Sequence, residues 1–542
     1  AGNDTLAGGA GWETLIGGTG ADHVDGGDGN DLVIVNPGDL DVGETLAGGA
    51  GVDVLRLAGT GAGSSVDLSG HGVGGFEVLD LDLASLTLSA AQVASLAPDL
   101  AIVDRHTGEA VTLRITGAAA SIDLSGWTLS GWEAWRDTIV IEGSPTATAY
   151  VGSGAYEQVS YAGASAGITA SLSSGVENTG DAAGDTYVAI DQITGTAHGD
   201  ALLGHAGVNA LYGGAGNDLL YGLDGDDNLQ GGDGDDLIEG GAGADFMDGG
   251  NGFDTVSYAS AAAPIVRYLG SSSTQPGDAR GDVLFSIEAL SGSAFADILG
   301  GGGGNETLSG AYGNDWLLGM HGDDTLKGDA GNDVLVGGAG SDVLDGGAGD
   351  DLAWYRDAGA GVEASLTSGG SGGEAAGDSY AAVENLWGSE FGDTLAGDGA
   401  ANQVYGFGGV DTLDGAGGDD IVYGGDGADT LTGGAGADSF QFLRWQGEGG
   451  DTIADFTSGT DRIAVSRFWF GIDTTGPAAA LQAGLADFVT SGGAVSALPT
   501  FYWNSATGVL GFDPDGQGQT PTFVLATLQP GASLLLSDIW SG

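Results

Sequence analysis

The stretch from Gly195 to Ser257 constrains the fold of this chain more than any other feature of its sequence. It holds seven consecutive nonads in one register, which follow the template G-G-x-G-x-D-x-U-x, where U is a large apolar residue. The glycines at positions 1, 2 and 4 allow positive φ angles and therefore a tight turn. The three residues x-U-x are long enough for a short strand. Each nonad thus predicts a turn followed by a strand.

Two such nonads make one coil of a flattened solenoid, with the U side chains of both walls meeting inside it. The residues at U are Leu220, Leu229, Ile238, Met247 and Val256. The predicted fold is all-β, a parallel β-roll or β-helix solenoid with β-rich spacers and a C-terminal β cap.

Stacked coils bring the aspartates at position 6 into two columns. Asp218, Asp236 and Asp254 fall in one column, and Asp227 and Asp245 fall in the other. Carboxylates about 4.8 Å apart repel one another strongly. Calcium suits such a column, because it accepts several carboxylate and carbonyl oxygens in flexible geometry. The sequence therefore predicts multiple Ca²⁺ ions.

This nonad resembles the calcium-binding repeat of the RTX (repeats-in-toxin) proteins. The resemblance implies that each ion lies between successive turns on one edge, held by the position-6 aspartate and by turn carbonyls. The predicted metal ligands are Asp22, Asp31, Asp53, Asp200, Asp218, Asp227, Asp236, Asp245, Asp254, Asp297, Asp315, Asp324, Asp333, Asp342, Asp351, Asp393, Asp411, Asp420, Asp429 and Asp438.

Position 6 departs from Asp at the same place in each run. Glu13, Asn209, Glu306 and Asn402 each stand in the second nonad. A repeated exception indicates a structural rule at the start of a roll. We expect these four positions to bind calcium weakly or not at all.

A second period of 97 residues separates Tyr161, Tyr258 and Tyr355, which open three similar spacers. Each spacer leads into a nonad run. The segment after Gln441 resembles the cap and type I secretion signal region of serralysin-type RTX proteins. The predicted organisation is an N-terminal roll (1–57), a β-rich non-RTX segment (58–150), three spacer-plus-roll segments (151–257, 258–354 and 355–441) and a C-terminal cap with the secretion signal region (442–542).

Within 58–150, alternating apolar residues predict strands near Phe76, Leu86, Ala110 and Asp137, and Ser89 is a candidate N-cap for a short helical turn. The same segment carries Trp127, Trp132 and Trp135. We interpret these tryptophans as core or edge packing; a carbohydrate-stacking or partner surface is the alternative.

Charge and composition exclude several classes of function. The net charge of −65, with 11 Lys and Arg against 76 Asp and Glu, argues against nucleic acid and anionic membranes as partners. The absence of cysteine excludes disulfides and thiolate metal sites. The sequence has no run of 18 apolar residues, so it predicts no transmembrane helix and no membrane insertion. Ala1 falls inside a repeat, so we expect a fragment or a mature form.

We therefore expect a secreted, extracellular or cell-surface bacterial protein exported by type I secretion, whose rolls fold on extracellular calcium. Its expected role is structural, of the surface-layer or adhesin type, with self-association or cell-surface polysaccharide as candidate partners. The histidines match no zinc motif, and the G-x-S-x-G match at Ser165 is lost in the other two spacers. We expect no enzyme here. The alternative is the export and folding region of a larger secreted protease, lipase or lyase.

Overall fold

The computed structural model describes residues 2–36, 38–59, 64–105, 110–133, 136–154, 157–173, 175–270, 277–444, 449–466, 470, 476–477, 487–489, 500–514 and 523–541. Nearly all of its regular structure is β-strand, so the predicted all-β class is confirmed. The chain divides into two compact units. Unit 1 holds Ala1–Ser257 with Arg280–Ile287, and unit 2 holds Tyr258–Ala279 with Glu288–Gly542.

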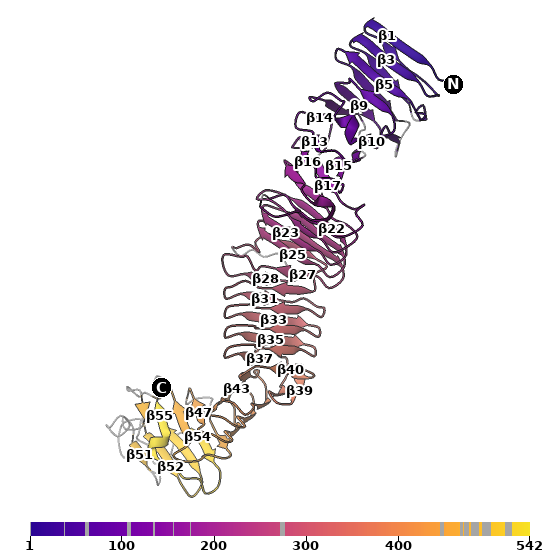
Figure 1. Ribbon diagram of the computed structural model, residues 1–542. Helices are drawn as coiled ribbons and strands as arrows, with labels where there is room; N and C mark the ends of the chain where they lie inside the picture. The colour runs from indigo at the N-terminus through magenta and orange to yellow at the C-terminus, as the bar shows by residue number, and fades with distance from the viewer. Residues whose placement is uncertain are drawn as a thin grey trace. The chain divides into compact units, whose positions relative to one another are not determined.

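In unit 1 the strands pair in parallel, coil upon coil (Figure 1). One sheet runs β1 (Thr5–Gly11), β3 (His23–Gly29), β5 (Thr45–Ala50) and β8 (Gly72–Gly74). A second runs β2 (Thr14–Leu15), β4 (Leu32–Val35), β6 (Val54–Ala58), β9 (Val78–Asp82), β11 (Ala101–Asp104) and β14 (Thr128–Ser130). A third runs β7 (Ser65–Asp67), β10 (Ser85–Ser89), β12 (Thr112–Thr116), β15 (Thr138–Glu142), β17 (Glu157–Ser160), β20 (Gln192–Thr194), β22 (Ala210–Ala215), β24 (Asn228–Asp233), β26 (Phe246–Asn251) and β29 (Val283–Phe285). The opposite wall is built from β13 (Ser121–Asp123), β16 (Ala149–Val151) and β19 (Thr186–Val188), and then from β18 (Thr169–Ser171), β21 (Ala201–Leu203), β23 (Leu219–Asp224), β25 (Leu237–Ala242) and β27 (Thr255–Ser257).

Unit 2 repeats the two-walled arrangement. One wall runs β28 (Val266–Tyr268), β31 (Ile298–Gly300), β33 (Trp316–His321), β35 (Val334–Ala339), β37 (Leu352–Trp354), β41 (Asn385–Trp387), β43 (Gln403–Gly408), β45 (Ile421–Asp426), β47 (Ser439–Phe442), β49 (Arg462–Val465), β55 (Ile539–Ser541) and β50 (Gly476–Pro477). The other holds β30 (Ala289–Ser291), β32 (Thr307–Ser309), β34 (Thr325–Lys327), β36 (Val343–Asp345) and β40 (Ser379–Ala381), followed by β39 (Gly369–Gly372), β38 (Glu363–Ser365), β42 (Thr394–Ala396), β44 (Thr412–Asp414), β46 (Thr430–Thr432), β48 (Asp451–Ile453), β54 (Phe523–Leu528), β53 (Val509–Asp513), β52 (Thr500–Asn504) and β51 (Asp487–Val489).

The register of these strands confirms that two nonads form one coil. Leu211 pairs with Leu229, and Leu229 pairs with Met247, so equivalent residues of one wall are 18 positions apart. On the opposite wall Leu220 pairs with Ile238. All five of these side chains have no exposed surface. The predicted inner rows are therefore confirmed.

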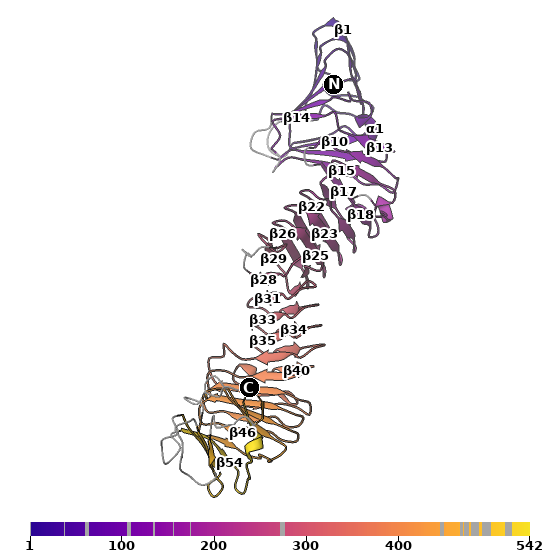
Figure 2. The ribbon, with the colours of Figure 1, turned by 90° about the vertical axis from the view of Figure 1, so that its left-hand side faces the viewer.

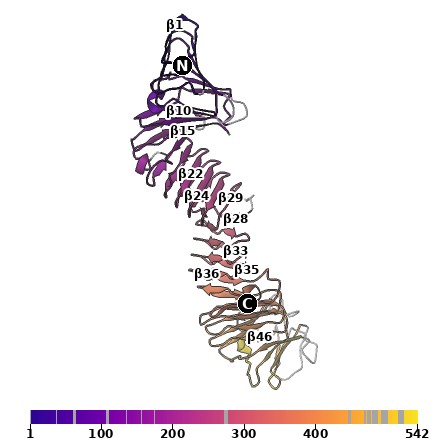
Figure 3. The same cartoon turned by 90° about the vertical axis from the view of Figure 1, so that its right-hand side faces the viewer.

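The segment 58–150 continues the solenoid without nonads. Its strands β10, β12 and β15 lie where we expected strands. They pair in parallel with one another and then with β17, in the sheet that continues to β22 (Figures 2 and 3). The helix α1 (Ala90–Val93) begins at Ser89, whose side chain accepts a hydrogen bond from the Gln92 N–H, so the N-cap prediction is confirmed. Trp127 is 5% exposed and packs in the core, whereas Trp135 lies outside the described residues.

One prediction about the glycines is wrong in part. Positions 2 and 4 do adopt positive φ, as at Gly214 (φ 115°) and Gly216 (φ 112°). Position 1, for example Gly213, is not among the residues with positive φ. A glycine is needed there because a Cβ would come too close to the position-6 carboxylate of the same nonad and to the main chain of the next coil.

The C-terminal part of unit 2 ends the solenoid by changing strand direction. The strand β48 pairs in parallel with β54, and β54, β53 and β52 then pair antiparallel. Phe470, Phe501 and Phe512 pack together beside these strands, with ring centroids 4.8–5.9 Å apart. The predicted β-rich cap is therefore present.

Candidate calcium-binding turns

The position-6 aspartates lie in the turns of the solenoid, where the sequence placed them. None of the twenty predicted ligands is more than 3% exposed. The N–H of Asp218 donates to Oδ1 of Asp236 (2.8 Å), and the N–H of Asp236 donates to Oδ1 of Asp254 (2.8 Å). On the other edge the N–H of Asp227 donates to Oδ1 of Asp245 (2.9 Å). The two predicted columns are therefore formed.

Unit 2 uses the same link between coils. The N–H of Asp315 donates to Oδ1 of Asp333 (2.8 Å), and the N–H of Asp411 donates to Oδ1 of Asp429 (2.9 Å). One carboxylate oxygen of each aspartate thus accepts a backbone N–H, which offsets part of the repulsion within the column.

The second carboxylate oxygen of most of these aspartates is buried and has no hydrogen-bond partner among the described residues. A buried acceptor without a partner costs about 1–3 kcal/mol, and a charged one costs more. This open Oδ2 belongs to Asp22, Asp31, Asp53, Asp218, Asp227, Asp236, Asp245, Asp315, Asp324, Asp333, Asp342, Asp351, Asp411, Asp420, Asp429 and Asp438.

Many of the open oxygens lie beside a main-chain carbonyl of the next coil, across a bare glycine. A Cβ added to Gly213 would lie 2.2 Å from Oδ2 of Asp218 and 2.6 Å from the carbonyl oxygen of Gly231. A Cβ on Gly319 would lie 2.4 Å from Oδ2 of Asp324. A carboxylate and a main-chain carbonyl are the hard oxygen donors that Ca²⁺ takes. The residues present therefore fit calcium.

Side chains alone do not complete a coordination shell at these turns. Within the described ranges, no three Asp, Glu, His or Cys side chains form a metal-binding group. Calcium takes six to eight oxygens. Main-chain carbonyls and water would therefore supply most of the ligands of a bound calcium ion, which fits a repeat whose turns are built from glycine.

Burial raises the pKa of several of the open carboxylates. Burial, together with the nearby carboxylates of Asp200 and Asp236, raises the pKa of Asp218 to about 7. Burial likewise raises the pKa of Asp315 and Asp411 to about 7. Without a cation, these turns pass from protonated to charged near neutral pH, so a bound metal and a proton compete for the same oxygens.

The first nonad of the roll in each of the three spacer-plus-roll segments differs from the rest. Oδ2 of Asp200, Asp297 and Asp393 accepts the N–H of a Thr or Ser at position 2, at 2.5, 2.6 and 2.6 Å. The hydroxyl of that residue, as in Ser293 and Ser389, donates to the same carboxylate. The sequence predicted these three aspartates as ligands. Because both of their oxygens already have donors, we expect them not to bind calcium.

In the second nonads of the three later rolls, the side chain at position 6 also accepts hydrogen bonds from N–H groups of its own turn. Oδ1 of Asn402 accepts the N–H of Asp398 (2.8 Å), and its Nδ2 donates to the carbonyl of Glu384 (2.8 Å). Asn209 accepts the N–H of His205 (2.6 Å). Glu306 accepts two glycine N–H groups, at 2.9 and 3.2 Å. These bonds support the expectation of weak or absent calcium binding.

Glu13 differs from the other three residues of this kind. Its Oε2 is buried without a partner in the described part of the chain. Burial and then the nearby Asp31 raise the pKa of Glu13.

The spacers carry acidic turns that sequence reasoning missed. Oδ1 of Asp185 accepts the N–H of Thr148 (2.7 Å), and its Oδ2 accepts the hydroxyl of Tyr161 (2.5 Å). Asp378 accepts the hydroxyl of Tyr355 (2.7 Å) in the same way. The available signal was the Gly-Asp pair that recurs in each spacer together with the aligned tyrosines. A tyrosine hydroxyl thus occupies the oxygen that the nonads leave open.

The segment 58–150 pairs its buried aspartates, Asp80 and Asp137, with arginine. Asp137 accepts the N–H of Val111 (2.9 Å) and of Glu133 (2.7 Å), and Arg136 donates through Nε to Oδ1 (3.0 Å). Burial alone would raise the pKa of Asp137, but Arg136 and the two N–H donors hold it below its ordinary value.

Comparison with known proteins agrees with this geometry. The family profile of the RTX calcium-binding nonapeptide repeat (4 copies) matches residues 1–24, 8–39, 194–229, 221–256, 288–317, 300–335, 319–353, 387–422 and 405–440. A search of curated proteins finds no significant match. In the described part of the chain, every helix is too short or too polar to cross a membrane.

Proposed function

Since the chain carries RTX calcium-binding nonapeptide repeats and binds multiple Ca²⁺ ions through them, we propose that it is a bacterial extracellular protein whose rolls fold when they meet calcium outside the cell. The observation that carries the proposal is the column of buried Oδ2 atoms, many of which lie beside a main-chain carbonyl. Such a turn is unfavourable when empty and favourable when it holds a divalent cation.

Calcium then supplies the free energy that orders a glycine-rich chain. The 111 glycines lose much backbone entropy on folding, and the net charge of −65 opposes compaction. Metal that binds only the folded state stabilises it by mass action. In the low calcium of the cytosol the rolls stay unfolded and pass through a type I exporter, for which the segment after Gln441 would carry the signal.

We propose a structural role for the folded protein, of the surface-layer or adhesin type, and no catalysis by these residues. Three spacer-plus-roll segments with the same period suit a scaffold.

The calcium-dependent step is tested by removing open oxygens from one roll. In the full chain, Asp218→Asn with Asp236→Asn keeps both Oδ1 acceptors and removes two charged Oδ2 atoms. We expect the calcium midpoint for folding of residues 195–257 to rise about tenfold, which corresponds to about 1.4 kcal/mol. The measurement is hydrogen exchange of that stretch during a calcium titration.

The matched control is Asp224→Asn, which removes a charge from an exposed position 3 of the same roll. Its midpoint should stay within about twofold of the parent, because surface substitutions seldom change stability by more than about 0.5 kcal/mol. Equal shifts in both variants would mean that only net charge matters, and the site assignment would fail.

The same calcium-loaded samples, viewed by electron microscopy, test the structural role. Ordered sheets or filaments support it. Monomers at every concentration favour the alternative, in which these residues are the export and folding region of a larger secreted hydrolase.

A further inference from the structure

The outer face of the sheet β2-β4-β6-β9-β11 in unit 1 is hollowed into a groove of about 470 Å³. The side chains that line it include Trp12, Val52, Val54, Arg56, Asp80 and Arg105. Pockets of about 300–1,000 Å³ are the usual size for small ligands. The groove crosses four strand spacings, or about 19 Å, so it suits an elongated ligand.

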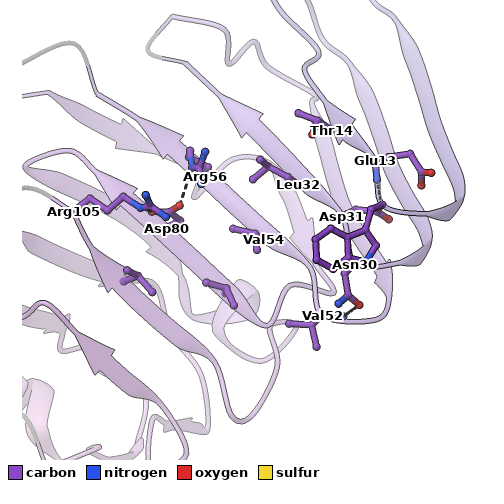
Figure 4. A pocket seen from close by; sticks show the side chains of 13 residues that line it. Glu13, Thr14, Asn30, Asp31, Leu32, Val52, Val54, Arg56, Asp80 and Arg105 are labelled. Atoms are coloured by element: carbon purple, nitrogen blue, oxygen red, sulfur yellow. Dashed lines mark hydrogen bonds and ion pairs between the residues drawn. The ribbon is translucent and has the colours of Figure 1, made fainter.

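One end of the groove holds a fixed pair of arginines (Figure 4). Arg56 donates through Nε to Oδ2 of Asp80 (2.8 Å), and Arg105 donates through Nε to Oδ1 (2.5 Å). The Asp80 side chain is 3% exposed, whereas those of Arg56 and Arg105 are 34% and 57% exposed. Two cations thus share one buried anion. The triad carries a net positive charge in a chain of −65.

The arginines keep donors for a ligand. Each uses Nε toward Asp80, and a guanidinium has five N–H donors in a planar fork. Their Nη groups match a carboxylate or a sulfate, which they can hold in a bidentate way. Because Asp80 fixes both guanidinium groups, little side-chain entropy is lost on binding.

Apolar and aromatic side chains line much of the rest of the groove. Trp12 is 83% exposed and Val52 is 52% exposed, both at position 5 of their nonads. Between them Asn30 accepts the N–H of Val52 through Oδ1 (3.0 Å), which leaves its Nδ2 as a donor. An indole offers a flat face to the C–H groups of a sugar ring, and the amide and the hydroxyl of Thr14 suit sugar hydroxyls.

An extended acidic peptide fits this surface less well. Peptides that bind sheets add to a free strand edge through main-chain hydrogen bonds. Here β4, β6 and β9 are each paired on both sides, so the groove presents side chains only. We therefore propose that the groove binds an anionic polysaccharide, with an acidic sugar on Arg56 and Arg105 and a sugar ring on Trp12. This partner rests on the extracellular location proposed above.

Calcium should support this binding. The groove also contains Glu13 and Asp31, whose charges would repel an anion. Asp31 is one of the aspartates with an open Oδ2, so a calcium ion at its turn would offset that charge.

The test is calorimetry of the full chain in saturating calcium with three short ligands of equal length, a uronate oligosaccharide, a sulfated one and a neutral glucan. We expect the anionic sugars to bind at least about tenfold more tightly than the glucan, because only they offer the guanidinium groups a charged acceptor. The uronate and sulfate arms show which acid the arginines prefer.

Arg105→Gln and Trp12→Ala should each weaken binding of the anionic sugar about tenfold. Both side chains are exposed, so the fold should survive, and hydrogen exchange of residues 14–104 checks that it does. The matched controls are Arg114→Gln, an exposed arginine outside the groove, and Tyr312→Ala, a 67% exposed aromatic of unit 2.

Equal binding of the neutral glucan, or equal losses in the controls, would overturn the proposal. Tighter binding of an oligo-aspartate than of either anionic sugar would overturn it in favour of an acidic protein segment. If the parent chain folds with calcium but binds none of the sugars, the groove assignment is refuted and the proposed function stands.

Discussion

Two parts of unit 1 share one solenoid and solve the same electrostatic problem differently. The coils of 64–142 hold their buried aspartates with arginine, as Arg136 holds Asp137. In the nonads of 195–257, the Oδ2 atoms of four aspartates are buried and have no hydrogen-bond partner among the described residues. They belong to Asp218, Asp227, Asp236 and Asp245. The pKa of Asp137 is lowered, whereas burial raises that of Asp218 to about 7. The comparison teaches that protein side chains compensate the buried carboxylates of the first part, whereas those of the second part need a cation.

Removal of calcium should separate the two parts most strongly. With excess chelator, we expect residues 195–257 to lose nearly all amide protection, because their turns lose the ions that hold them. Residues 78–142 should keep theirs, since protein side chains close their turns. Hydrogen exchange with mass spectrometry resolves both stretches in one sample. Loss of both together, or of neither, would break the comparison.

Acidification of the metal-free protein should give the second largest contrast. Asp218 and Asp245 have a pKa of about 7 in the fold, above the ordinary value of 3.8. Their contribution to stability is therefore full below about pH 4 and is lost as the pH rises through about 7. Between pH 8 and pH 5.5, we expect the metal-free roll to regain protection.

The arginine-closed coils should not respond over the same range. A lowered pKa, as in Asp137, gives stability that is lost only as the pH falls below the ordinary carboxylate range. Exchange rates of residues 110–142 at pH 8 and pH 5.5, corrected for intrinsic rates, should agree. A matching gain in that stretch would show that the fold responds to net charge as a whole.

Arg136→Gln should have the smallest effect on hydrogen exchange, because it removes the partner of a buried carboxylate in one turn only. The Asp137 side chain is fully buried and that of Arg136 is 10% exposed, so the change leaves a buried carboxylate with less compensation. Breaking such a pair costs about 3 kcal/mol. We expect faster exchange in residues 110–142 and no change in the calcium midpoint of residues 195–257. Arg114→Gln, at a half-exposed pair with Glu142, is the control and should change little.

The sequence by itself determined the coil, the inner rows, the acidic columns and calcium, because a nine-residue period fixes which residues stack whatever lies outside it. Leu220, Ile238 and Met247 could be placed inside from spacing alone. Only the tertiary structure decided which carboxylates stay open. The groups that close them, such as Tyr161 for Asp185, lie 24 positions away and meet only when the coils stack. The groove follows the same logic, since Arg56 and Arg105 reach Asp80 from 24 and 25 positions on either side. A local repeat encodes its own neighbours, whereas contacts between unlike coils exist only once the chain has folded.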